Sequence, residues 1–126
     1  MVASVLEKRE RMVSRLLIES LFAGSRSMAA FPLRAVYKTR PCSKGDAPVQ
    51  LLLSVPKKHF HHAVDRNRIK RQLREAYRLH KALLYEALPP DEQLLLALIW
   101  LSDTQLTTRE VEGRVVSLMQ RMAEKL

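Results

Sequence analysis

The stretch Ala63–Lys81, AVDRNRIKRQLREAYRLHK, constrains the fold of this chain more than any other. Apolar and weakly polar residues recur in it at spacings of three and four, which predicts an amphipathic helix with one face packed on a core. The residues of this stripe are Ile69, Leu73, Ala76, Tyr77 and His80.

The rest of the predicted helix is strongly basic. It carries seven Lys and Arg residues against two acids, so most of the chain's formal net charge of +9 lies on one element. Glu75 is the only acid within the helix body, whereas a solvated helix face usually alternates in sign. Like charges at i,i+4, such as Lys70 and Arg74, repel each other, and a polyanion relieves this repulsion. The pattern favours nucleic acid as the partner. The basic face comprises Asn67, Lys70, Arg71, Arg74, Arg78 and Lys81.

Length and composition predict one globular domain, residues 1–126, without a membrane segment. The apolar run Leu94–Leu101 is far too short to cross a bilayer, and the N-terminus lacks the apolar core of a signal peptide. The single cysteine, Cys42, has no partner for a disulfide within the chain and is expected to be a loop thiol. We therefore expect a cytoplasmic protein.

The N-terminal half is predicted to contain one helix and two or three strands. The helix is expected over Lys8–Ala23, after a capping box formed by Ser4 and Glu7. Ser25–Arg40 is expected to form one or two strands, because Pro32 is tolerated only at an edge, a strand start or a break. Val49–Val55 is an apolar run of strand length.

The C-terminal half completes an α+β pattern. The central helix is expected to continue to Leu84, Leu94–Leu101 to form an interior strand covered on both faces, and a last helix to run from a Thr107–Glu110 capping box to Ala123. Arg34–Tyr37 and Leu51–Leu53 are expected to pair as an antiparallel hairpin. The predicted fold is a single α+β domain of order α-β-β(-β)-α-β-α, with a small sheet of about four strands. The basic helix lies in a β-α-β crossover, for which a right hand is the default.

No catalytic or metal-binding pattern is visible in the sequence. With three glycines in the whole chain, no Gly-rich phosphate loop is present. His59, His61 and His62 lie in a loop without a cysteine, so they suit extra cations beside phosphates better than metal ligands. The acids are scattered and do not form the carboxylate cluster that holds paired catalytic metal ions. We expect no catalytic residue, no metal site and no cofactor bound by the protein alone.

The segment RNRIKRQLREAYR, preceded by SVPKKHFHHAVD, resembles the signature of the bacterial ribonuclease P protein subunit. The matching residues are Ser54, Val55, Lys57, Lys58, Ala63, Val64, Arg66, Asn67, Arg68, Lys70, Arg71, Leu73, Arg74 and Glu75. The resemblance implies an endoribonuclease in which the RNA subunit removes the 5′ leader of precursor tRNA by magnesium-assisted hydrolysis, with this chain as an auxiliary. It also implies the ribonuclease P RNA and precursor tRNA as partners, and a left-handed crossover in place of the default.

The resemblance further implies two binding surfaces. The first contacts the catalytic RNA and its phosphates through Lys57, Lys58, Arg66, Asn67, Arg68, Lys70, Arg71, Arg74 and Arg78. For Asn67, a structural cap near the helix start is the alternative. The second surface is a cleft between the central helix and the sheet, where the single-stranded leader stacks on aromatic rings. Its best candidate is Tyr37, followed by Phe22 and Phe31, with core packing as the alternative for all three.

Two other interpretations compete with this one. A structural RNA-binding protein of the ribosome carries a similar basic helix and has no part in cleavage. A DNA-binding module is disfavoured, because the basic helix lacks the preceding partner of a helix-turn-helix. We therefore expect neither DNA nor a membrane as a partner.

Overall fold

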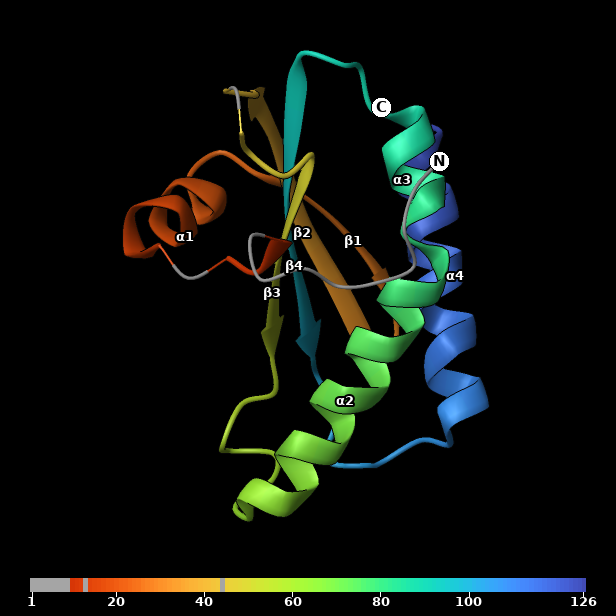
Figure 1. Ribbon diagram of the computed structural model, residues 1–126. Coiled ribbons are helices and arrows are strands. Elements are labelled where there is room, and N and C mark those ends of the chain that lie inside the picture. The colour runs from red at the N-terminus through yellow and green to blue at the C-terminus, as the bar shows by residue number, and fades with distance from the viewer. Residues whose placement is uncertain (1–9, 13, 44) are drawn as a thin grey trace.

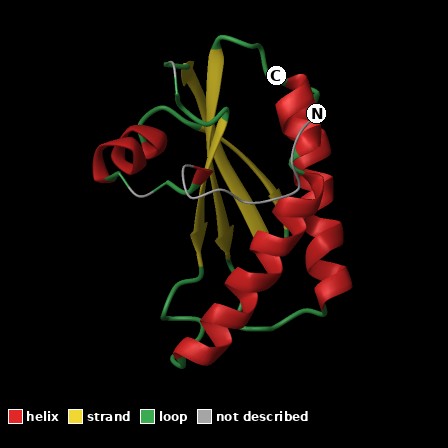
Figure 2. Cartoon of the chain, viewed as in Figure 1, coloured by secondary structure: helices red, strands yellow, loops and turns green. Residues whose placement is uncertain are grey.

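The computed structural model describes residues 10–12, 14–43 and 45–126, and these form the predicted α+β domain (Figures 1 and 2). The elements in chain order are α1 (Arg15–Phe22), β1 (Arg26–Ala30), β2 (Leu33–Pro41), β3 (Val49–Ser54), α2 (Ala63–His80), α3 (Ala82–Ala87), β4 (Glu92–Trp100) and α4 (Thr108–Ala123). The predicted order is confirmed, with the additional strand present as β1 and a short extra helix as α3.

The four strands form one mixed sheet in the order β1-β2-β4-β3. β2 pairs antiparallel with both β1 and β4, whereas β3 pairs parallel with β4. The predicted hairpin between Arg34–Tyr37 and Leu51–Leu53 is wrong, because β4 lies between these two strands. β4 takes the central position because Leu94–Leu98 is apolar without interruption and is fully buried from both faces of the sheet.

Helices cover both faces of the sheet, and Figure 1 shows α1 on one side and α2, α3 and α4 on the other. The larger core lies under α2 and α4 and includes Tyr77, Trp100 and Leu118. The smaller core lies under α1 and consists of Met12, Leu21, Val36, Leu95 and Ala97. Alternate residues of β4 therefore serve opposite cores, as the two-residue period of a strand requires.

The first helix starts later than predicted. It begins at Arg15, and the Ser14 hydroxyl caps it by accepting a hydrogen bond from the Leu17 amide. The expected start at Lys8 and the Ser4–Glu7 capping box lie outside the described residues. Residues 10–12 are not part of the helix, because Met12 donates its amide to the carbonyl of Leu51 at 2.9 Å along the open edge of β3. Pairing with this strand edge takes the place of a longer helix.

The central helix ends earlier than predicted. α2 ends at His80 and does not continue to Leu84. A separate helix, α3, begins at Ala82. The break falls at Lys81, whose ammonium group is buried and bonded to Glu10. Lys81 is therefore not part of the exposed basic face to which the sequence pattern assigned it.

The apolar stripes of the two long helices are confirmed. Ile69, Leu73, Ala76 and Tyr77 of α2 are buried, with His80 partly exposed at the end of the stripe. In α4, the Thr107–Glu110 capping box forms, and all five residues predicted for its apolar stripe are buried. The residues of that stripe are Val111, Val115, Leu118, Met119 and Met122.

We expect Leu73→Ala to lower the free energy of unfolding by about 2–5 kcal/mol, because Leu73 is 0% exposed in the larger core. Leu79→Ala is the matched control, since it makes the same change on the same helix at a side chain that is 50% exposed. Chemical denaturation of both variants measures the difference. Equal losses for the two variants would show that the phase of the helix is wrong.

Candidate nucleic-acid interface

Arg66 holds the start of α2 in place. The N-cap position, His62, provides no side-chain cap. The guanidinium of Arg66 instead donates to the carbonyls of Phe60 and His61, at 2.8 and 2.9 Å, in the connector before the helix. One of the predicted phosphate contacts is therefore engaged in fixing the connector.

Arg68 is also held by neighbouring residues. Its guanidinium donates to the side-chain oxygen of Gln105, whose amide in turn donates to Asp65 at 3.1 Å. One turn further along, Gln72 donates to the carbonyl of Leu106 and to a hydroxyl at the start of α4. The loop after β4 is thereby fastened to the first half of α2.

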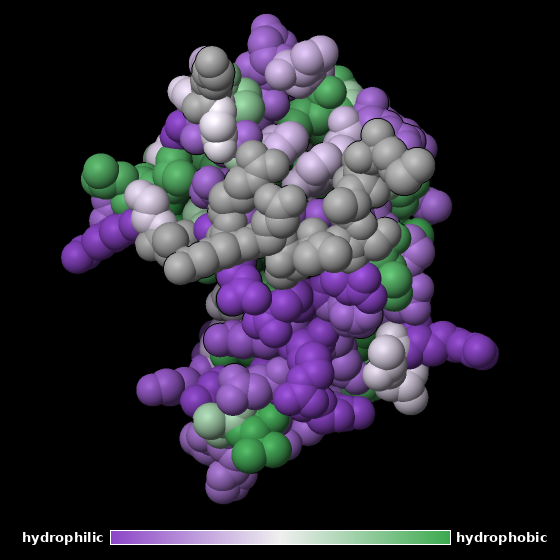
Figure 3. Space-filling model, viewed as in Figure 1, coloured by the Kyte–Doolittle hydropathy of each residue, from purple (hydrophilic) through white to green (hydrophobic). Residues whose placement is uncertain are grey.

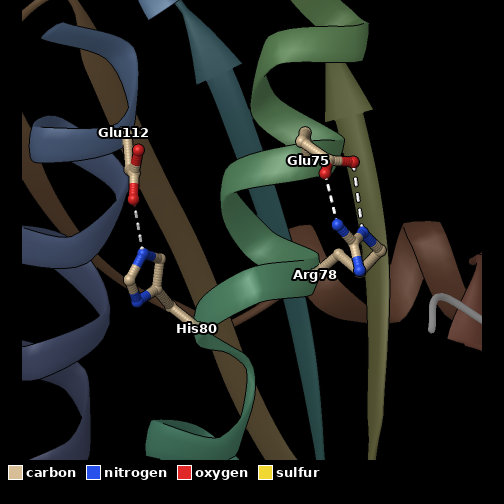
Figure 4. Close-up of polar contacts among 4 residues, drawn as sticks. All are labelled: Glu75, Arg78, His80 and Glu112. Atoms are coloured by element: carbon tan, nitrogen blue, oxygen red, sulfur yellow. Dashed lines mark hydrogen bonds and ion pairs between the residues drawn. The ribbon is translucent and has the colours of Figure 1, made fainter. Parts of the chain in front are cut away.

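Arg78 forms an ion pair with Glu75 on the surface of α2 (Figure 4). The hydrogen bonds from Arg78 lower the pKa of the Glu75 carboxyl, and those to Glu75 raise the pKa of Arg78. Figure 4 also shows His80 pointing across to Glu112 of α4, 2.8 Å away. The one acid in the helix body thus pairs with Arg78, although the sequence allows Arg71 equally.

The side chains of the other predicted RNA contacts form no hydrogen bond or ion pair with any described residue. Lys57, Lys58, Asn67 and Arg71 are exposed, and Lys70 and Arg74 are half-buried. This excludes the capping role for Asn67, which lies inside α2, four residues after its start. The structure divides the predicted set into arginines with protein partners (Arg66, Arg68 and Arg78) and unpaired side chains (Lys57, Lys58, Asn67, Lys70, Arg71 and Arg74).

A groove of about 170 Å³ lies between α2, the edge of β3 and residues 11–12. Its lining combines apolar residues with cations, and consists of Arg11, Met12, Leu51, Leu52, Leu53, Lys70 and Arg74. Figure 3 shows hydrophilic side chains gathered over α2 on the viewed face. Positive charge around an apolar floor suits a single-stranded nucleic acid, because phosphates contact the cations and bases cover the apolar surface.

The predicted aromatic candidates do not line this groove. Tyr37 is only 4% exposed in the larger core, and lines a different cavity of about 490 Å³ beside Gly24 and Pro89. Phe22, at the end of α1, is 49% exposed, and Phe31, in the β1–β2 turn, is 69% exposed. Tyr37 therefore packs in the core, which is the alternative to leader binding, whereas Phe31 does not.

Among the described residues, no group of three or more His, Cys, Asp and Glu side chains is placed to hold a metal ion. His59 contacts Asp103 at 2.5 Å, while His61 and His62 are exposed. No helix in the described part of the chain is long and apolar enough to span a membrane.

Sequence reasoning missed two contributors to this interface. Arg11 lines the groove although it lies far from the basic helix in sequence, and Gln105 orients Arg68 from the loop after β4. The sequence around Arg11 or Gln105 does not predict this position, because each residue is placed by contacts between segments that are distant in the chain.

Comparison with known proteins identifies the family of the chain. The family model described as Ribonuclease P matches residues 6–123. The ribonuclease P protein component of Porphyromonas gingivalis is 37% identical over 119 residues, which cover 94% of this chain and 86% of that protein. The corresponding protein of Chlorobaculum tepidum is 42% identical over 90 residues, covering 66% of this chain and 58% of that protein.

Solved structures share the fold at lower identity. The ribonuclease P protein of Thermotoga maritima superposes with a TM-score of 0.69 at 20% identity, covering 89% of this chain and 96% of that one. The protein from Staphylococcus aureus superposes with a TM-score of 0.65 at 21% identity, covering 91% and 95% of the two chains. With the family model spanning nearly the whole chain, this protein belongs to the ribonuclease P protein family.

Proposed function

We propose that this chain is the protein subunit of ribonuclease P, which binds the catalytic RNA and the 5′ leader of precursor tRNA. The observation that carries the proposal is the row of unpaired cations Lys70, Arg71 and Arg74 on α2, in a chain that belongs to the family. Unpaired, accessible Lys and Arg side chains bind phosphates by releasing counterions, and the arginines add a planar fork that fits phosphate.

In this proposal, the RNA subunit performs the cleavage and the protein holds no catalytic residue and no cofactor. Magnesium ions bound by the RNA assist the hydrolysis that releases the leader. The protein presents α2 and the connector lysines Lys57 and Lys58 to the catalytic RNA, and the groove beside β3 to the leader. Lys70 and Arg74 lie where these two surfaces meet, because they belong to α2 and also line the groove. Such a subunit acts in the cytoplasm. No observation favours the ribosome-associated alternative.

Purified protein without RNA is expected to leave precursor tRNA intact. Addition of a bacterial ribonuclease P RNA should restore removal of the 5′ leader at a magnesium concentration at which that RNA alone is slow. Gel analysis of the cleaved precursor measures both reactions. Specific leader removal by RNA-free protein would overturn the auxiliary assignment.

Arg71→Ala and Arg74→Ala are expected to weaken binding of the catalytic RNA and to flatten its salt dependence by about one unit each at most. Arg15→Ala removes an equal charge from α1, on the opposite face of the sheet, and is expected to leave the slope unchanged. Binding titrations over a series of salt concentrations measure the slopes. Equal slopes for all three variants and the parent protein would contradict a phosphate-binding face on α2.

Arg66→Ala is compared with Arg71→Ala in the same titrations and, in addition, by thermal denaturation. Because Arg66 is bonded to two connector carbonyls, its loss should also lower the melting temperature, whereas loss of the unpaired Arg71 should not.

Beyond the groove, contact of leader bases with the protein is expected to depend on exposed aromatic rings and not on Tyr37. Phe22→Ala or Phe31→Ala should reduce the preference for precursor over mature tRNA, since stacking on one base contributes about 1–3 kcal/mol. Tyr37→Leu, which removes a buried ring, is the control and should keep the preference in the folded protein. Binding of the two tRNA forms to the reconstituted holoenzyme measures this. A loss of preference in Tyr37→Leu alone would restore Tyr37 as the leader contact.

A further inference from the structure

A buried ion pair joins the N-terminal segment to the junction between α2 and α3. Glu10 is 2% exposed and Lys81 is 3% exposed, although 71 residues separate them in the chain. The Lys81 ammonium donates to the two carboxylate oxygens of Glu10 at 2.9 and 3.1 Å, and the Tyr85 hydroxyl donates to Oε2 at 2.7 Å. The ammonium also lies 5.4 Å from the centre of the Tyr85 ring. We call Glu10, Lys81 and Tyr85 the clamp.

Stability alone does not account for the clamp. Moving two charges out of water costs free energy that their attraction only partly repays, and apolar residues of similar volume often stabilise a protein as well or better. A buried ion pair instead fixes the relative position of its two side chains, because a displacement of either one leaves a buried charge without its partner. The neighbouring Tyr77 phenol adds no charge, since burial raises its pKa well above the usual value.

The clamp fixes the two sides of the groove relative to each other. On one side, Glu10 is followed by Arg11, which lines the groove, and by Met12, whose amide bonds to Leu51 of β3. On the other side, Lys81 directly follows α2, the helix that carries Lys70 and Arg74 into the same groove. A bond between Glu10 and Lys81 therefore sets the separation of Arg11 from the two cations of α2.

We propose that Glu10, Lys81 and Tyr85 are positioning residues that hold Arg11 opposite Lys70 and Arg74, so that the groove grips the phosphates of a single RNA strand from both sides. Arg11 is the contact residue, and the clamp acts through it. The identity of that strand as the leader of precursor tRNA depends on the function proposed above, whereas the positioning role does not.

The test uses the double variant Glu10→Gln/Lys81→Met, which removes both charges of the ion pair at once. Amide hydrogen exchange of the protein is the first readout. Exchange at Met12 should accelerate at least tenfold in the variant, because its bond to Leu51 is no longer anchored, while exchange at Leu73 in the core of α2 should stay unchanged. Unchanged exchange at Met12 in the folded variant would refute the positioning role.

The second readout is the affinity for a short single-stranded oligoribonucleotide, measured by fluorescence anisotropy. The clamp variant and Arg11→Ala should each bind roughly two- to fivefold more weakly, the factor that an exposed ion pair contributes. Combining all three substitutions should weaken binding no further than Arg11→Ala does, because the clamp acts through Arg11. Full additivity of the losses, or parent-like affinity of the clamp variant, would also overturn the proposal.

A second variant and a separate binding measurement complete the experiment. If the double variant does not fold, Tyr85→Phe removes only the hydroxyl that donates to Glu10, and the same two readouts should shift in the same direction by smaller factors. Tyr85→Phe with parent-like Met12 exchange and affinity would then count against the clamp.

Binding of the catalytic RNA by the parent protein is measured separately. If it is absent, the proposed function fails while the oligonucleotide and exchange data still decide the positioning role.

Discussion

The structure depends on the burial of β4 from both sides. Leu94, Leu96 and Leu98 face the core under α2 and α4, while Leu95 and Ala97 face the core under α1. A strand that is apolar on both faces requires a layer on each, so α1 has to cross to the face opposite the long helices. Because β3 runs parallel to β4, the chain between them has to return along the sheet, and α2 is that return. The basic helix therefore lies in the crossover connection between these two parallel strands.

The basic residues of α2 divide into two groups with different work. Arg66, Arg68 and Arg78 are bonded to the connector, to Gln105 and to Glu75, and so help to define the ends and surroundings of the helix. Lys70, Arg71 and Arg74, which lie between them on the helix, form no ion pair within the described part of the chain. An arginine that is already held by protein partners loses less side-chain conformational entropy when its surface binds a ligand. The basic motif is thus part scaffold and, in the proposed function, part RNA-binding face.

Other segments of the chain contact both edge strands of the sheet. Residues 11–12 pair with β3, and on the far edge Arg121 and Arg114 of α4 donate to the carbonyls of Ala29 and Phe31 at 2.8 and 3.0 Å. Covered edges resist unwanted strand pairing. On the β3 side the same segment also contributes a cation, Arg11, to the groove, so one segment contacts the strand edge and lines the groove.

The sequence by itself determined the element order, the buried stripes of α2 and α4, the interior character of β4 and the basic face of α2. These follow from period and composition, which act over a few neighbouring residues. Tertiary structure alone decided that β4 separates β2 from β3, since strand pairing depends on which strand can be buried on both faces. It also decided that Tyr37 is covered while Phe31 is open, because alternation along a strand does not reveal what packs on each face. Lys81 is the clearest case: by sequence it continues a basic face, yet a carboxylate 71 residues away draws it into the interior. Contacts between segments distant in the chain determine the position of such residues, and the local sequence pattern does not predict those contacts.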